Sequence, residues 1–254
     1  FGFPPKTITS SVHDDLLFID RVVGCKIALA DVRSSYPTAN QLLALLREIQ
    51  VGGMISSKGG VLHIHLGALP EGMDMLFELI EKYHVDIKRL SPTHVGRTAH
   101  LFEQAQRFVK LGGMVDLSTG GTQFRPPWEA LAQAHADGAD LRQFTLSSDG
   151  NAGIGILDAE GQLTGFKKAP IDLNLWNVQQ MLRETDVPAE LALGLVTSGP
   201  ARTMGLKRKG HIAQGMDADA CLFDDQWNLT GVVSRGEILM WDGDLRTQGN
   251  FPRA

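Results

Sequence analysis

Two histidines one residue apart in an apolar run are a common start of a hydrolase metal site. The run VLHIHLG, residues 61–67, contains such a pair, His63 and His65. Alternate side chains of a β-strand share a face, so both imidazoles could bind one metal ion. A lone histidine on a strand is more often a hydrogen-bonded packing residue than a ligand. The pair alone therefore leaves both interpretations open.

Other residues that could bind a metal ion or a proton lie in neighbouring apolar runs or at their ends. Lys26 lies in CKIALAD, His94 follows IKRLSPT, Ser118 closes MVDLS, and Asp149 ends QFTLSSD. Each has a structural explanation, since Asp-Gly is common turn chemistry and a strand lysine can reach solvent at a sheet edge. Scattered polar residues rarely fall at comparable positions on separate strands by chance. Their recurrence favours a functional site.

The elements that would position these residues are alternating strands and helices. Between residues 24 and 150, the apolar runs alternate with segments whose apolar residues have helical spacing, which predicts five βα units and a parallel sheet. The helical spacing is clearest at Leu42, Leu45, Leu46 and Ile49, at Leu76, Leu79, Ile80 and Tyr83, and at Leu101, Ala105 and Phe108. Functional groups in such architectures lie at the carboxyl ends of the strands.

The rest of the chain changes character twice. The glycine-rich residues 150–169 are predicted to be irregular, and helical patterns cover residues 173–204. Beyond them, short apolar runs separated by Gly and Asp turns predict a small β appendage. The glycines after Asp149 lack the spacing of a dinucleotide-binding loop.

Composition excludes several classes of function. The 254 residues are 43% hydrophobic and 21% charged, which is an ordinary globular balance. A net charge of -5 and a pI near 5.9 give no electrostatic case for nucleic acid or an anionic membrane, and favour small molecules or copies of the chain as partners. Two distant cysteines support neither a disulfide scaffold nor a cysteine zinc cluster, which suits a cytoplasmic location.

The order lysine, histidine, histidine, aspartate resembles that of the amidohydrolase superfamily. Within it, the phrases TITSS, PTHVGR, LSSDGN and GMDADACLF are most similar to bacterial isoaspartyl dipeptidases, and the likeness covers nearly the whole chain. The resemblance implies an α/β fold, a TIM-type (βα)8 barrel with a binuclear metal site, together with a small β-sandwich appendage.

The family's order also numbers the strands. Its His-x-His pair lies on barrel strand one, its lysine on four, single histidines on five and six, and its aspartate on eight. Because Lys26 precedes the HIH run, the five runs correspond to strands four to eight. Residues 1–204 are then expected to be the C-terminal part of the barrel, and residues 205–254 a segment of the small β domain. Five strands cannot close an eight-stranded barrel, so the chain is expected to be part of a longer protein.

The resemblance further implies a site. Lys26, carboxylated on its side-chain nitrogen, would hold one divalent ion with His65 and His94, and a second with Asp149 and the His-x-His pair. In this assignment His63 is not a ligand, but a packing residue or a residue next to the ligands. Nitrogen and oxygen ligands suit zinc, and a metal-bound hydroxide would hydrolyse β-aspartyl dipeptides with Asp149 as general base.

Substrate binding and assembly are also implied. Arg33 and Arg97 would hold the dipeptide's α-carboxylate, although each could instead form a helix-cap or surface ion pair. The enzyme is expected to be a homo-oligomer. Two departures are visible, because Phe1 stands about where the family has a tyrosine and Gly153 stands where it has a serine.

Three alternatives remain open. Another amidohydrolase, such as a cyclic amidase or an N-acyl-amino-acid hydrolase, would use the same metal site. An inactive fragment could bind metal without hydrolysis. An open nucleotide-binding sheet would lack its glycine fingerprint and leave the order of the four residues unexplained.

Overall fold

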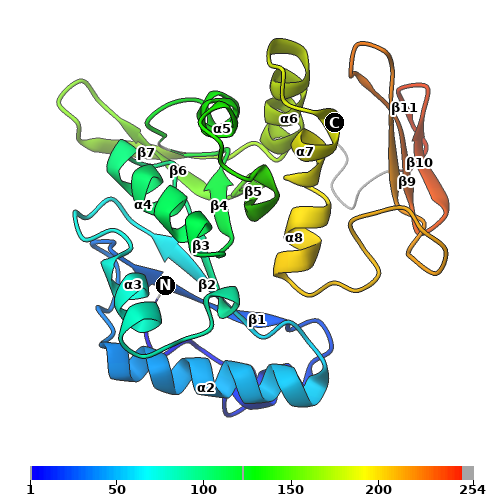
Figure 1. The fold of residues 1–254 in the computed structure, drawn as a ribbon. Coiled ribbons are helices and arrows are strands. Elements are labelled where there is room, and N and C mark those ends of the chain that lie inside the picture. The colour runs from blue at the N-terminus through cyan, green and yellow to red at the C-terminus, as the bar shows by residue number, and fades with distance from the viewer. Residues whose placement is uncertain (1, 122, 248–254) are drawn as a thin grey trace.

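The molecule is built on a five-stranded parallel sheet (Figure 1). This computed structural model describes residues 2–121 and 123–247. The strands lie in the order of the sequence, as predicted, with each paired to the next. Their bounds are β1 Gly24–Leu29, β2 Val61–Leu66, β3 Leu90–Thr93, β4 Val115–Ser118 and β5 Phe144–Ser147. Short 3₁₀ turns, Ile87–Arg89 and Leu141–Gln143, lead into β3 and β5.

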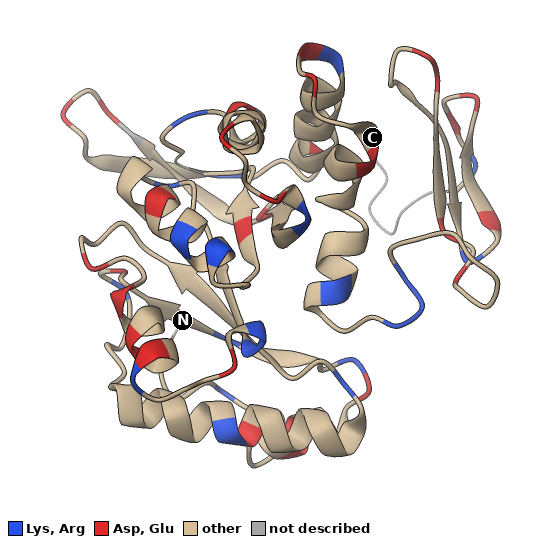
Figure 2. Cartoon of the chain, in the orientation of Figure 1, with Lys and Arg blue, Asp and Glu red and all other residues tan. Residues whose placement is uncertain are grey.

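Helices connect these strands and cover one face of the sheet. They are α2 Ala39–Ser56, α3 Asp74–Glu81, α4 Ala99–Lys110 and α5 Pro127–Ala136, and they carry the predicted helical spacing. Helix α2 begins with a capping box, in which Thr38 and Gln41 each bond the other's backbone N–H. The unpredicted helix α1, Val12–Phe18, is capped by Ser11, which accepts from Asp14 N at 3.0 Å. Lysines, arginines and acidic residues are interspersed over the outer helices (Figure 2).

The two faces of the sheet differ in chemistry. Ile27 of β1 and Ile64 of β2 belong to the buried core, which they share with the helices. The alternate positions turn to the other face, which we call the polar face. It is formed by Lys26, His63, His65, Ser91, Thr93, Asp116, Ser118, Thr145 and Ser147. Buried parallel strands are usually apolar throughout, so this alternation marks the inner face for chemistry.

Residues 150–169 form a hairpin, so the prediction of an irregular segment was wrong. Antiparallel strands β6 Gly153–Leu157 and β7 Leu163–Lys168 pair with each other. Glycines in β6 hide the alternation of apolar and polar residues that is typical of a strand, because large side chains of β7 occupy the space where side chains of β6 would lie. A Cβ on Gly153 would lie 3.4 Å from Phe166 Cδ1, and one on Gly155 would lie 2.9 Å from Leu163 Cδ1.

The C-terminal part agrees with the predicted helices and short strands. Helices α6 Leu173–Glu184, α7 Ala189–Gly194 and α8 Ser198–Thr203 precede an antiparallel sheet in the order β11-β10-β9-β8. Its strands are β8 Ala220–Phe223, β9 Leu229–Ser234, β10 Glu237–Trp241 and β11 Asp244–Leu245. In residues 2–121 and 123–247, this part is a single sheet, without the second layer that a sandwich requires.

Gly67 sets the approach of β2 to the loop after β1. A Cβ at Gly67 would lie 2.1 Å from the carbonyl oxygen of Ala30 and 2.4 Å from Cα of Asp31. Backbone atoms cannot swing aside as a flexible side chain can. We therefore expect Gly67→Ala to lower the free energy of unfolding by about 1–3 kcal/mol, measured by chemical denaturation.

Gly194→Ala on α7 is the matched control for this change. Its Cβ would meet only Ser198 Oγ, at 3.4 Å, and alanine is the better helix former. Equal stability of the Gly67→Ala variant and the parent would contradict the close approach.

Candidate metal centre

Strand register brings the predicted site residues to one face. Lys26 of β1 lies opposite His63 of β2, while Ala28 lies opposite His65 and His65 lies opposite Thr93. His94 follows β3 directly and has a φ of 66°, a left-handed conformation that is uncommon outside glycine. Such conformations cluster at functional sites, where the surrounding structure has to hold them.

His65 and His94 meet on the polar face. Their ring centroids are 4.4 Å apart with an interplanar angle of 72°, and each residue is only 3% exposed. His65 Nε2 donates to Asp31 Oδ2 at 2.8 Å, and a hydrogen bond joins His94 Nδ1 to Ser118 Oγ. One nitrogen of each ring is thus held by a partner, as in histidines that bind a metal through the other nitrogen.

The second nitrogen of His94 supports this interpretation. Its Nε2 is buried and has no hydrogen-bond partner among the residues that the structure describes. A buried polar atom in this condition is rare in folded proteins and calls for an explanation. Two adjacent imidazoles beside a strand lysine fit a divalent metal.

Burial keeps the site histidines neutral. It lowers the pKa of His94 to about 2, with the charge of Arg97 contributing next, and it lowers the pKa of His63 to about 4, with the charge of Lys26 contributing next. Burial also lowers the pKa of His65. A neutral imidazole is the form that binds a metal ion.

Lys26 and Asp149 interact electrostatically with residues of the candidate site. Lys26 is exposed on β1, and its charge also contributes to the lowered pKa of His94. Asp149 is exposed, follows β5 by two residues and has a φ of 48°. Its charge partly opposes the effect of burial on the pKa values of His63 and Arg97. Among the described residues, no three of His, Cys, Asp and Glu gather closely enough to hold a metal.

The two arginines differ in their contacts. Arg33 donates to Asp31 through Nε at 2.9 Å and Nη2 at 2.7 Å, and this pairing holds the pKa of Asp31 well below its usual range. Arg97 is half-buried, and burial lowers its pKa. No hydrogen bond or ion pair reaches its guanidinium from the described part of the chain. Arg97 is therefore the better placed of the two to receive a carboxylate.

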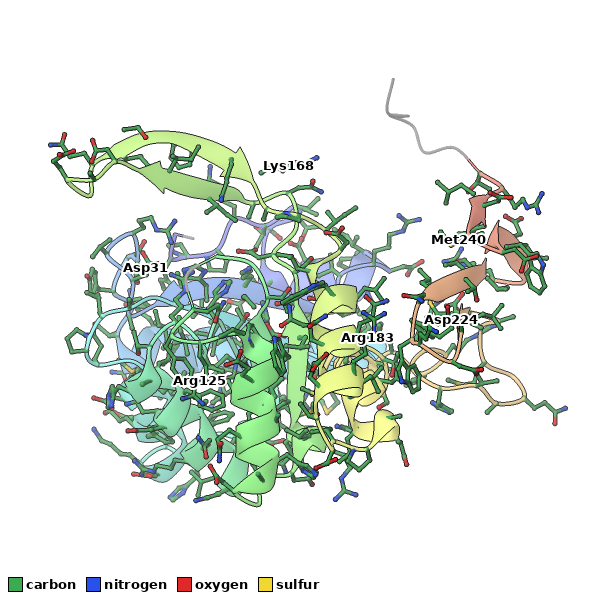
Figure 3. The ribbon with its side chains drawn as sticks, turned by 90° about the horizontal axis from the view of Figure 1, so that it is seen from above. Asp31, Arg125, Lys168, Arg183, Asp224 and Met240 are labelled. Carbon is green, nitrogen blue, oxygen red and sulfur yellow. The ribbon has the colours of Figure 1, made fainter. Side chains whose placement is uncertain are left out.

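Three polar residues of the site were not among the predicted ligands or substrate-binding residues. Asp31 orients His65, Ser118 orients His94, and Asp116 lies buried on the polar face of β4. The sequence could have indicated Asp116, because it is a charged residue inside the apolar run MVDLS. Lys26 is likewise a charged residue inside the apolar run CKIALAD. Asp31 and the hairpin residue Lys168 both lie apart from Asp224, which follows β8, and from Met240 of β10 (Figure 3).

The two positions at which the sequence departs from the family pattern are Gly153 and Phe1. Gly153 lies at the start of β6. Phe1 lies outside the described residues, so its correspondence to the family's tyrosine stays a prediction.

A comparison with protein families agrees with this geometry. Residues 38–239, most of the chain, match the profile of the amidohydrolase family. The chain belongs to the amidohydrolase family. This amidohydrolase is 36% identical to a β-aspartyl dipeptidase of Fervidobacterium islandicum AW-1, solved in complex with a β-Asp-Leu dipeptide. The two superpose with a TM-score of 0.90 over 99% of this chain and 67% of that chain.

Further matches support the fold class. A second structure of the β-aspartyl dipeptidase from Fervidobacterium islandicum gives 35% identity and a TM-score of 0.87, over 99% of this chain and 65% of that one. An adenine deaminase of Methanothrix thermoacetophila is 33% identical over 79 residues, which are 30% of this chain and 14% of the deaminase. The expected fold, a TIM-type barrel with strands four to eight present here, is confirmed.

The chain is shorter than its relatives. It spans about two thirds of the two dipeptidase chains and 14% of the adenine deaminase. No helix in the described residues has the length and apolar character needed to cross a membrane.

Proposed function

We propose that this amidohydrolase hydrolyses β-aspartyl dipeptides at a two-metal centre. The observation that carries the proposal is the buried pair of His65 and His94, 4.4 Å apart between ring centroids, with Arg97 half-buried nearby. Support for the substrate comes from the similarity to a dipeptidase solved with β-Asp-Leu.

Four residues of this chain would hold the metals. Lys26 as its carbamate, His65 and His94 would bind one ion, and Lys26 and Asp149 would contribute to the other, together with the His-x-His pair that the family resemblance implies. Zinc suits these nitrogen and oxygen donors. Bound metals of this kind activate a water molecule and polarise the scissile carbonyl.

The remaining chemistry belongs to side chains described above. Asp31 and Ser118 orient the two histidines through one nitrogen each. Asp149 would take a proton from the attacking water and return it to the leaving amine. Arg97 would bind the substrate's α-carboxylate, while the guanidinium of Arg33 pairs with Asp31 and lies 3.3 Å from His65 Nε2.

A substrate panel tests the proposal. The full-length protein, with its metal content measured, is assayed with β-Asp-Leu, α-Asp-Leu, hydantoins and N-acyl amino acids. We expect about two ions per chain and turnover of β-Asp-Leu only. Turnover of a hydantoin or an N-acyl amino acid instead would identify another amidohydrolase activity, and absence of both metal and turnover would indicate an inert relative.

Arg97→Met tests the carboxylate contact. Loss of a charge-assisted hydrogen-bonding pair should lower kcat/KM for β-Asp-Leu by roughly 10–100-fold, mainly through KM, with metal content unchanged. Analogues with one carboxylate at a time converted to an amide should show which group Arg97 binds, because that analogue alone is processed equally by parent and variant.

Arg107→Met is the control for this change. Arg107 pairs with Glu81 on the exposed surface of the outer helices, so its loss should leave kcat/KM unaltered. An unchanged KM in the Arg97→Met variant would remove Arg97 from the substrate site.

Cytoplasmic location, homo-oligomeric assembly and a domain boundary between residues 204 and 205 are part of the same proposal. They follow from the resemblance and from the change of pattern along the chain.

A further inference from the structure

Asp116 is a buried carboxylate with an unusual set of partners. It is 6% exposed on the polar face of β4. Thr93 Oγ1 and Ser147 Oγ donate to its Oδ2 at 2.6 Å each, and Thr145 Oγ1 donates to its Oδ1 at 2.7 Å. Barrel interiors are usually filled by branched aliphatic side chains, and burying a carboxyl group is costly. A purely packing role would be better served by an apolar residue.

The contacts of Asp116 lead directly to His94. Thr93 immediately precedes His94, and the backbone N–H of Val95, which immediately follows it, donates to the carbonyl oxygen of Asp116 at 3.3 Å. Ser118, two residues along β4, binds the ring at Nδ1. Strand β4 therefore contacts the residue before His94, the residue after it and the imidazole ring itself.

This hold matters because His94 is in an unfavourable conformation. Its φ of 66° lies in the left-handed region, where a residue with a Cβ stays only if its surroundings hold it. The conformation places its ring against His65. Relaxation of the backbone to an extended conformation would move the imidazole away from this position.

We propose that Asp116 is a positioning residue of the metal centre, which fixes His94 in its left-handed conformation through the Thr93 hydroxyl and its own backbone carbonyl. The inference rests on the proposed function, because it takes His94 as a metal ligand. Asp116 acts on the reaction only through His94.

Two threonines of the Asp116 cluster provide a matched test. Thr93 and Thr145 are both buried, and each donates one hydroxyl hydrogen bond to the Asp116 carboxylate. Thr93→Val and Thr145→Val make the same chemical change and remove the same kind of bond. Only Thr93 is covalently joined to His94. Thr93→Ser keeps the hydroxyl, and Asp116→Asn keeps the shape of the carboxylate.

The measurements are the affinity of the full-length protein for zinc, the visible absorption of its cobalt(II) form, its Tm, and kcat and KM for β-Asp-Leu. We expect Thr93→Val and Asp116→Asn to weaken zinc binding by about 10–100-fold, as loss of a partner behind a ligand does, and to alter the cobalt spectrum. Thr93→Ser should restore both properties. Thr145→Val should lower Tm while leaving zinc affinity and spectrum as in the parent.

Equal losses of zinc affinity in Thr93→Val and Thr145→Val would overturn the proposal and make the cluster a general stabiliser. Unchanged affinity and spectrum in Thr93→Val and Asp116→Asn would also overturn it, as would a parent protein that binds no metal. If Thr93→Val does not fold, the zinc affinities and cobalt spectra of Asp116→Asn and Thr145→Val are compared instead. The proposal then requires a loss in Asp116→Asn that is absent in Thr145→Val. If the variants show the expected zinc affinities and cobalt spectra but the parent does not hydrolyse β-Asp-Leu, the proposed substrate is wrong and the positioning role of Asp116 still holds.

Discussion

We expect the His94→Asn variant to lose metal-dependent hydrolysis and to keep its fold. Asparagine is shorter than histidine, and its amide is a poor metal ligand, so the centre loses a donor beside His65. Asparagine tolerates the left-handed φ of 66°, so the backbone should stay in place. The loss of zinc affinity should exceed the roughly 10–100-fold expected for a residue behind a ligand. Metal content, activity and circular dichroism of the purified variant measure these effects.

His84→Asn is the matched control for His94→Asn. His84 is exposed and also has a left-handed φ, 55°, so the same substitution is made in a similar backbone conformation away from the site. We expect the parent's metal content and activity in this variant. Full activity in His94→Asn would show that His94 is a buried packing residue.

We expect the Asp149→Asn variant to lose most of its kcat. Asparagine cannot take a proton from water, and removal of a general base typically lowers the rate by about 10²–10⁴-fold. KM for β-Asp-Leu should change little, because Arg97 still binds the carboxylate. Steady-state kinetics at saturating zinc separate the two parameters.

The same variant decides between a catalytic residue and a turn residue. Asp149 and Asp242 both precede a glycine and both have a left-handed φ, 48° and 52°. Asparagine forms such turns as well as aspartate does. Asp242→Asn should therefore behave like the parent in stability and kcat. Identical kinetics in the two variants would make Asp149 a turn residue only.

Local patterns predicted most of the fold for a physical reason. The alternation of apolar runs with helical spacing reflects burial on one side of each element, and it correctly predicted β1 to β5 with α2 to α5. The pattern failed at residues 150–169. There, Phe166 and Leu163 occupy the space above Gly153 and Gly155, so glycine in β6 indicates close packing across the hairpin.

The placement of the candidate site residues was predicted in part. The positions of Lys26 within a strand and of His65 and His94 at strand ends follow from the sequence pattern, because each residue lies in or directly after an apolar run. Arg33 and Arg97 were both candidate carboxylate binders, each with an ion pair as the alternative, and the sequence did not show that only Arg33 would pair with Asp31. Asp116 was missed because its hydroxyl donors come from two other strands.

The sequence alone determined the order of elements, the polar and apolar faces of the sheet and the types of donor available, since these depend on residues close together in the chain. Only the tertiary structure decided which nitrogen of each histidine is held and which arginine is already paired. Those outcomes depend on contacts between distant residues, such as Asp31 with His65, Thr93 with Asp116 and His94 with Ser118. Spacing along one strand carries no information about such contacts.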